Sequence, residues 1–140
     1  MADGTVNASI TTDRVSARVK AKVSCVGNQP TGTLDATVVV RRLLRRETLT
    51  VTSNRATLVK TVKRPSIEHV EAHFRDVTIR NLTTNEVLRN CTAVLVATQV
   101  ASNLVLLVLS VNCPGNRNLR LFGFFRGDVD VFREDLCGDV

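Results

Sequence analysis

Residues 15–25, VSARVKAKVSC, alternate strictly between apolar and polar side chains over eleven positions. The valines, the alanines and Cys25 fall on one side of an extended chain, and Arg18, Lys20 and Lys22 fall on the other. An α-helix would spread the same valines around its whole circumference. The stretch therefore predicts a long β-strand with one buried face and one basic face in water.

Comparable runs of valine, leucine and threonine continue along the chain, separated by Gly, Asn and Pro turn signals. They cover residues 34–40, 49–52, 58–62, 92–100, 104–113 and 119–132, and a further strand begins at Val77 and Ile79, turns near TTNE (83–86) and returns through Val87. Residues 66–77 fit two periods, because Val70, Ala72 and Phe74 alternate as in a strand, while Val70, Phe74 and Val77 also share a helical stripe. The strand is favoured. About eight short strands predict a single all-β domain, a β-sandwich or jelly roll.

The composition excludes several classes of protein. The longest apolar run, residues 104–111, is far shorter than the ~18 to 20 residues of a membrane helix, so no membrane insertion is expected. The start of the chain, MADGTVNASITTDR, has no basic region and no apolar core, so no Sec-type signal peptide is predicted. No Ser/His/Asp or Cys/His grouping and no phosphate-binding glycine loop is visible. We therefore expect a protein that is not an enzyme and needs no cofactor.

Charge is unevenly distributed along the chain, whose formal net charge is +6. Residues 14–64 hold twelve Lys and Arg against two acidic residues, whereas residues 65–140 hold seven Arg against nine acidic residues. This division is typical of a polyanion-binding protein, and equally of subunits that attract one another head to tail. Trp and Tyr are absent, which disfavours recognition of single-stranded nucleic acid by base stacking.

The most basic stretch is residues 37–50, TVVVRRLLRRETLT, in which Arg41, Arg42, Arg45 and Arg46 flank two leucines. If the preceding alternation continued, Arg42 would point into the core, so a bulge, a turn or a helical turn must interrupt the pattern here. One interpretation is a nucleic-acid contact. The preferred one is a protruding sheet corner, whose basic rim meets the acidic stretch GDVDVFRED of a neighbouring subunit.

The four cysteines, Cys25, Cys91, Cys113 and Cys137, are too far apart for a CxxC zinc site. Cys25 and Cys113 end strands in similar stretches, VSCVGN and VNCPGN, and could pair across one end of a sandwich. Cys137 is three residues from the C-terminus, where we expect it outside the core and able to reach another subunit. The alternative is that all four are reduced and act as small apolar side chains.

His69, Glu71 and His73 share one face if the stretch EHVEAH is extended. Two imidazoles and a carboxylate could bind a metal, but a charged, solvated strand surface is the favoured interpretation, so no metal is predicted. The tripeptide RGD at residues 126–128 is interpreted as a hairpin turn.

Residues 1–13 are small and polar, which predicts a flexible N-terminal arm before a domain over residues 14–140. Val6, Ala8 and Ile10 nevertheless alternate with polar residues, so the arm could add a strand to the sheet of another subunit. A disordered tail and an inter-subunit strand both remain open.

An all-β chain rich in Val and Thr, with the stretch ADGTVNASITT and the strand-end cysteines of VSCVGN and VNCPGN, resembles the jelly-roll subunits of bacterial endospore appendages. The resemblance implies a structural protein that assembles outside the cell without a secretion signal. In that family an N-terminal connector carries cysteines that cross-link neighbouring subunits. Here the first cysteine is Cys25, which leaves Cys137 as the thiol for such a link.

Together these patterns predict a non-enzymatic subunit that assembles with itself into an extracellular filament or a layer on a cell or spore surface. Assembly would use the N-terminal arm and disulfide cross-links. The alternative is a small basic β-domain in the cytoplasm that binds nucleic acid or another polyanion, or a small viral coat protein. Nucleic acid is the less favoured partner.

Overall fold

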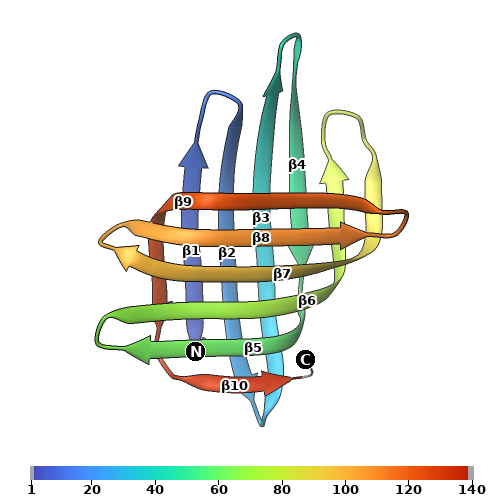
Figure 1. Cartoon of the computed structure of the whole chain (residues 1–140). Helices are drawn as coiled ribbons and strands as arrows, with labels where there is room; N and C mark the ends of the chain where they lie inside the picture. Colours follow the sequence, from blue (N-terminus) through green and yellow to red (C-terminus); the bar gives the residue numbers. More distant parts are fainter. Residues whose placement is uncertain (1, 139–140) are drawn as a thin grey trace.

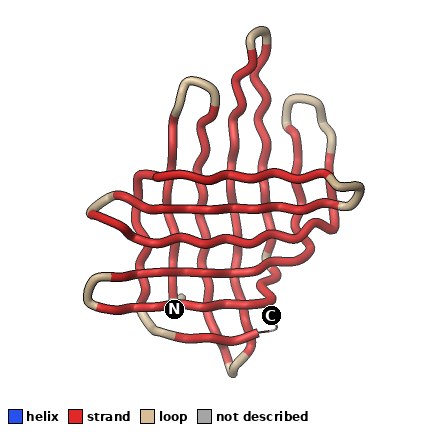
Figure 2. Tube along the Cα trace, in the orientation of Figure 1, coloured by secondary structure: helices blue, strands red, loops and turns tan. Residues whose placement is uncertain are grey.

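The chain forms ten antiparallel β-strands, and no helix occurs between residues 2 and 138, the residues that this computed structural model describes. The strands are β1 (Gly4–Thr11), β2 (Val15–Val26), β3 (Gln29–Arg42), β4 (Arg45–Ser53), β5 (Arg55–Arg64), β6 (Ile67–Asn81), β7 (Val87–Ala101), β8 (Leu104–Cys113), β9 (Arg117–Val131) and β10 (Asp135–Gly138). Short loops join them (Figure 2). The all-β prediction is confirmed, as is a strand over most of residues 66–77.

None of the described residues lies in a helix that could cross a membrane.

The sheet closes on itself. Strands β1, β2, β3, β4, β6, β7, β8 and β9 each pair with the next, and β9 pairs back with β1. The result is an eight-stranded antiparallel barrel, where the sequence predicted a sandwich or jelly roll. Closure depends on β6, which pairs along one edge first with β5 and then with β4, and along its other edge with β7. Alternation reports which side of a strand is buried but not which strand lies beside it, so the sequence does not reveal this closure.

The barrel is flattened into two layers whose strands cross (Figure 1). Strands β1 to β4 form one layer, and β5 to β8 with the first part of β9 run across them in the other (Figure 1). The core lies between the layers, and its largest side chains are Phe74 of β6 and Phe125 of β9, each 1% exposed. β5 and the short β10 extend the second layer beyond the closed ring.

Strand β9 passes from one layer to the other at the RGD tripeptide, which is not the hairpin turn that the sequence predicted. Up to Arg126 the strand pairs with β8, and from Arg126 onward it pairs with β1. Gly127 has a φ of +147°, and a Cβ atom there would overlap the carbonyl oxygen of Asn7 in β1. Only glycine lets the two backbones approach so closely at this corner.

The N-terminal residues form part of the barrel instead of the expected flexible arm. Gly4–Thr11 is β1, which pairs with β2 on one edge and with β9 on the other. Val6 and Ala8 are buried in the core and Ile10 packs against it. Two strands of the same chain therefore occupy both edges of β1, and no edge is left for strand addition to a neighbour.

Candidate assembly surface

The outer face of the second layer is apolar across three neighbouring strands. Along β8 the odd-numbered side chains from Val105 to Val111 are buried in the core, so the even-numbered ones point outward. Leu106 pairs with Phe124 of β9, and Val108 pairs with Phe122 of β9 and Val96 of β7. We call the outward side chains of these strands the apolar face; its members are Val94, Val96, Leu106, Val108, Phe122 and Phe124.

Phe122 and Phe124 are the most exposed members of the apolar face, at 66% and 60% of their full area. Arg120 lies on the same side of β9, with its guanidinium 5.9 Å from the centroid of the Phe122 ring. Aromatic side chains of this size usually dominate the energetics of cores and interfaces. A contiguous exposed patch of such residues is typical of a surface that another molecule covers.

The outer face of the first layer is different, because its central rows are polar. Lys20 of β2 pairs with Asn7 of β1 and Asp35 of β3, and Asn7 pairs in turn with Asp128 of β9. In this row one lysine lies among two acidic side chains and an amide, whereas the row of Ser9 holds Arg18 and Arg126. The outer face of the first layer is therefore polar, as expected of a solvated surface. The contrast makes the apolar face the candidate functional surface of the protein.

The two rims of the apolar face carry different side chains, and the carboxylate on the β6 rim, that of Glu71, is opposite Lys60 of β5. Arg120 and Arg126 point outward from β9 on one side, and β6 presents His69, Glu71 and His73 on the other. Nδ1 of His69 lies 2.8 Å from Oγ1 of Thr98, and Nε2 of His73 lies 3.3 Å from a Glu71 oxygen. The two imidazoles have separate partners and do not converge on one point.

His69 should make stability depend on pH. Burial disfavours the imidazolium and lowers the pKa of His69 below 6.5, against the smaller opposing effect of Glu71. Below pH 6.5 the unfolded chain then binds more protons than the native one, so the free energy of unfolding should fall as pH drops. Urea unfolding from about pH 7 to about pH 5 should show a shallower decline for His69→Gln than for the wild type. Parallel curves for the two proteins would contradict this assignment.

All four cysteines form intrachain disulfides, Cys25 with Cys137 and Cys91 with Cys113. The predicted pairing of Cys25 with Cys113 is wrong, and so is the position of Cys137 outside the core, because its side chain is 5% exposed. Cys137 is opposite Val59 in the β10–β5 pair, and this brings it over the end of β2 that carries Cys25. No thiol is left for a cross-link between subunits.

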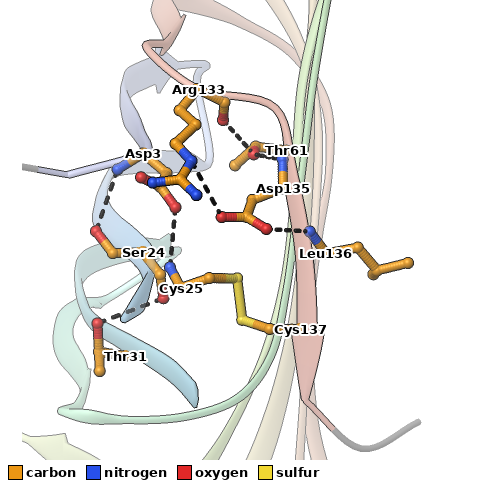
Figure 3. The surroundings of a disulfide bond; sticks show 9 residues. All are labelled: Asp3, Ser24, Cys25, Thr31, Thr61, Arg133, Asp135, Leu136 and Cys137. Atoms are coloured by element: carbon orange, nitrogen blue, oxygen red, sulfur yellow. Dashed lines mark hydrogen bonds and ion pairs between the residues drawn. A yellow bond between two sulfur atoms is a disulfide. The ribbon is translucent and has the colours of Figure 1, made fainter. Parts of the chain in front are cut away.

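A polar network surrounds the Cys25–Cys137 disulfide (Figure 3). The Cys25 amide donates to a carboxylate oxygen of Asp3 at 2.9 Å, and the Asp135 amide donates to the Thr61 hydroxyl at 2.9 Å. One carboxylate oxygen of Asp135 lies 3.5 Å from Nε of Arg133. Asp3, Cys25 and Asp135 bring potential metal ligands close together, but the Cys25 sulfur is already bonded to Cys137. The group therefore anchors the chain end and offers no thiolate to a metal.

A pocket of about 400 Å³ opens at the end of the barrel between β4, β6, β7 and β9. Its apolar wall includes Leu49 and Leu119, and its rim carries Glu86 and Arg117. Arg117 donates to both carboxylate oxygens of Glu86, at 2.9 and 3.0 Å. These hydrogen bonds, helped by the charge of Arg117, lower the pKa of Glu86. A carboxylate held ionised by its own guanidinium is a poor general acid, so we assign this pair a structural role.

The four arginines of residues 41–46 lie at the end of the β3–β4 hairpin, which projects beyond the rest of the barrel (Figure 1). A tight turn at Leu43 and Leu44 lies within the predicted break, although β3 continues without a bulge to Arg42, which is exposed beyond the core. The exposed fractions of these two side chains are 101% and 97%. Arg41 donates from Nη1 to the Thr12 carbonyl at 3.2 Å, and so ties the base of the hairpin tip to the neighbouring β1–β2 turn.

The chain was compared with models of protein families, with curated proteins and with solved structures, and none of the three comparisons finds a match.

Proposed function

We propose that this protein is a non-enzymatic structural subunit that associates with copies of itself through the apolar face. The observation that carries the proposal is the outward position of Phe122 and Phe124 on a layer whose inner side already supplies the core. Strand β8 is apolar on both sides, which is usual for strands covered on both faces. A second β layer packed on this face would cover it.

Charge supports a second copy as the partner. In a two-fold dimer the apolar face of one copy packs against the apolar face of the other, turned by half a rotation. A side chain away from the axis therefore contacts residues from the opposite side of the face on the other copy. The basic rim at Arg120 and Arg126 of one copy can then lie over the rim at Glu71 of the other. Side chains of β7 and β8, such as Val96 and Val108, would then lie nearest the axis, and the phenylalanines of β9 would pack toward β6 of the other copy.

The extracellular placement rests on the disulfides. Two intrachain disulfides in a chain of 140 residues are typical of proteins that fold in an oxidising compartment. A two-fold contact by itself closes a dimer. A filament or surface layer outside the cell, as the resemblance to endospore-appendage subunits implies, would therefore be built from such dimers through a second contact. The contact within the dimer would be made face to face, because β1 and all four cysteines are occupied within the chain.

The test is the effect of Phe122→Ser/Phe124→Ser on the mass of the protein in solution. We expect the wild type to form dimers or larger species as concentration rises in sedimentation velocity, and the double variant to remain a monomer. Phe132→Ser is the matched control, since Phe132 is 57% exposed but lies beyond the end of β9. Circular dichroism checks that each variant is folded. A wild type that stays monomeric at high concentration, or a double variant that assembles normally, would refute the proposal.

A further inference from the structure

The tip of the β3–β4 hairpin combines two features that are unfavourable for an isolated protein. The first is the exposure of Leu43 and Leu44, whose surfaces are almost entirely accessible to solvent. The second is like charge in register, because Arg42 is directly opposite Arg45 and Arg41 is directly opposite Arg46. Like charges opposite each other destabilise a strand pair. Both features become favourable against a surface that is anionic and has an apolar interior.

Few intramolecular contacts relieve the repulsion at the tip. Arg45 forms an ion pair with Glu47 at 2.9 Å, and Arg41 is bonded to a carbonyl oxygen of the β1–β2 turn. Within residues 2–138, no carboxylate forms an ion pair with Arg42 or Arg46. At least two guanidinium groups at this tip are thus available to an anionic partner.

The order of side chains along the hairpin matches the layers of a membrane surface. The leucines are at the far end, and the paired arginines follow one and two residues behind them on each strand. Since successive residues of a strand point to opposite sides, one arginine pair lies on each side of the ribbon. A hairpin that meets a membrane end-on would place the leucines below the headgroups and all four arginines among the phosphates. We propose that this tip docks the protein on the surface of an anionic lipid bilayer.

Nucleic acid suits the same tip less well. A phosphate backbone that lies along one side of the ribbon would meet only one of the two arginine pairs, and Leu43 and Leu44 would stay in water. The tip also has no aromatic side chain on which a base could stack. Docking through two residues is interfacial and does not require a membrane-spanning segment. It places the hairpin at a headgroup surface while the barrel stays in water.

The experiment is co-sedimentation of the purified protein with vesicles of phosphatidylcholine, alone or mixed with phosphatidylglycerol. We expect binding to the mixed vesicles, little binding to phosphatidylcholine alone, and weaker binding as salt rises. Leu43→Ser/Leu44→Ser should weaken binding about tenfold or more. Arg42→Gln/Arg46→Gln should weaken it about fivefold for each arginine removed.

Two controls separate the tip from the rest of the surface. Lys20→Gln/Lys22→Gln removes the same charge from the outer face of β2, and Val26→Ser removes an exposed apolar side chain at the β2–β3 turn. Both should bind the mixed vesicles at least half as well as the wild type. Equal losses in these controls and in the tip variants would overturn the proposal, because net charge or general apolarity would then explain binding.

Other outcomes would also overturn the proposal. Vesicle binding that survives Leu43→Ser/Leu44→Ser but is lost in Phe122→Ser/Phe124→Ser would assign lipid contact to the apolar face. Tight binding of a DNA duplex that depends on the arginines and not on the leucines, without vesicle binding, would assign the tip to nucleic acid. The monomeric Phe122→Ser/Phe124→Ser variant should still bind mixed vesicles, so this inference and the assembly proposal can fail separately.

Discussion

Replacing Cys25 and Cys137 together with alanine is expected to lower the free energy of unfolding by about 5 kcal/mol. The disulfide links residues 112 positions apart, so it removes a very large loop from the unfolded ensemble. It also holds β10, a strand of four residues that pairs with β5 alone. Loss of the link should therefore release the C-terminal strand as well as destabilise the barrel.

The matched control is Cys91→Ala/Cys113→Ala, which opens a loop of 22 positions between the adjacent strands β7 and β8. This change should cost about 3 kcal/mol on the same loop-entropy argument. Equilibrium unfolding in urea ranks the two variants, and amide hydrogen exchange should show early loss of protection in β10 only for the first. A larger loss in the control would mean that loop size does not govern these disulfides.

Gly127→Ala is expected to be the most damaging single methyl addition in the barrel, costing about 3 kcal/mol or more. Its Cβ would overlap the Asn7 carbonyl oxygen and lie 2.7 Å from the Cα atom of Ala8. Both are backbone atoms of β1, so no side-chain rotation can make room. The φ of +147° adds backbone strain for any residue with a Cβ.

Gly123→Ala tests whether steric overlap is the cause. Gly123 is on the same strand, but the nearest atom to its added Cβ would be Cδ1 of Ile10 at 3.7 Å, an ordinary contact distance. Thermal unfolding should show a much smaller loss of melting temperature for Gly123→Ala than for Gly127→Ala. Equal losses would indicate that β9 is simply intolerant of alanine, and that the corner has no special role.

Local patterns predicted the strands well because they depend on one buried side. The alternation of residues 15–25 corresponds closely to β2, and Val70, Ala72 and Phe74 are buried along β6 as a strand requires. A break between Val40 and Leu49 was predicted because an arginine could not enter the core, and the turn at Leu43 and Leu44 lies there. The strand itself runs on through Arg42, which avoids the core because the hairpin projects beyond the barrel. Each of these inferences uses neighbours a few residues apart.

Features that depend on distant parts of the chain were not predictable in this way. Whether β1 is an arm or a barrel strand depends on β9, more than a hundred residues later, which supplies its second edge. The partner of Cys25 likewise depends on where β10 docks. The pattern of apolar residues within a segment does not indicate which distant segment will pair with it.

The apolar face had a signal that sequence reasoning did not use. Residues 104–109 are apolar at both odd and even positions, which suggested a buried strand without revealing what covers its second side. Phe122 and Phe124 flank Gly123, and from the sequence alone they resemble core residues. In the structure the side chain of Phe125 points into the core, so those of Phe122 and Phe124 point to solvent. Register, which the turns and partners set, was the missing information.

The position of β1 between β2 and β9 also determines when the native structure can form. β1 is near the start of the chain and its partner β9 is near the end, so the barrel closes only through contacts of very large sequence separation. Such topologies fold slowly, typically over milliseconds to seconds. Until β10 docks, Cys25 lacks its native partner, and Cys91 and Cys113 are the other cysteines with which it can form a disulfide. Oxidative maturation of this protein should therefore pass through non-native disulfides, and a thiol–disulfide isomerase should speed its recovery.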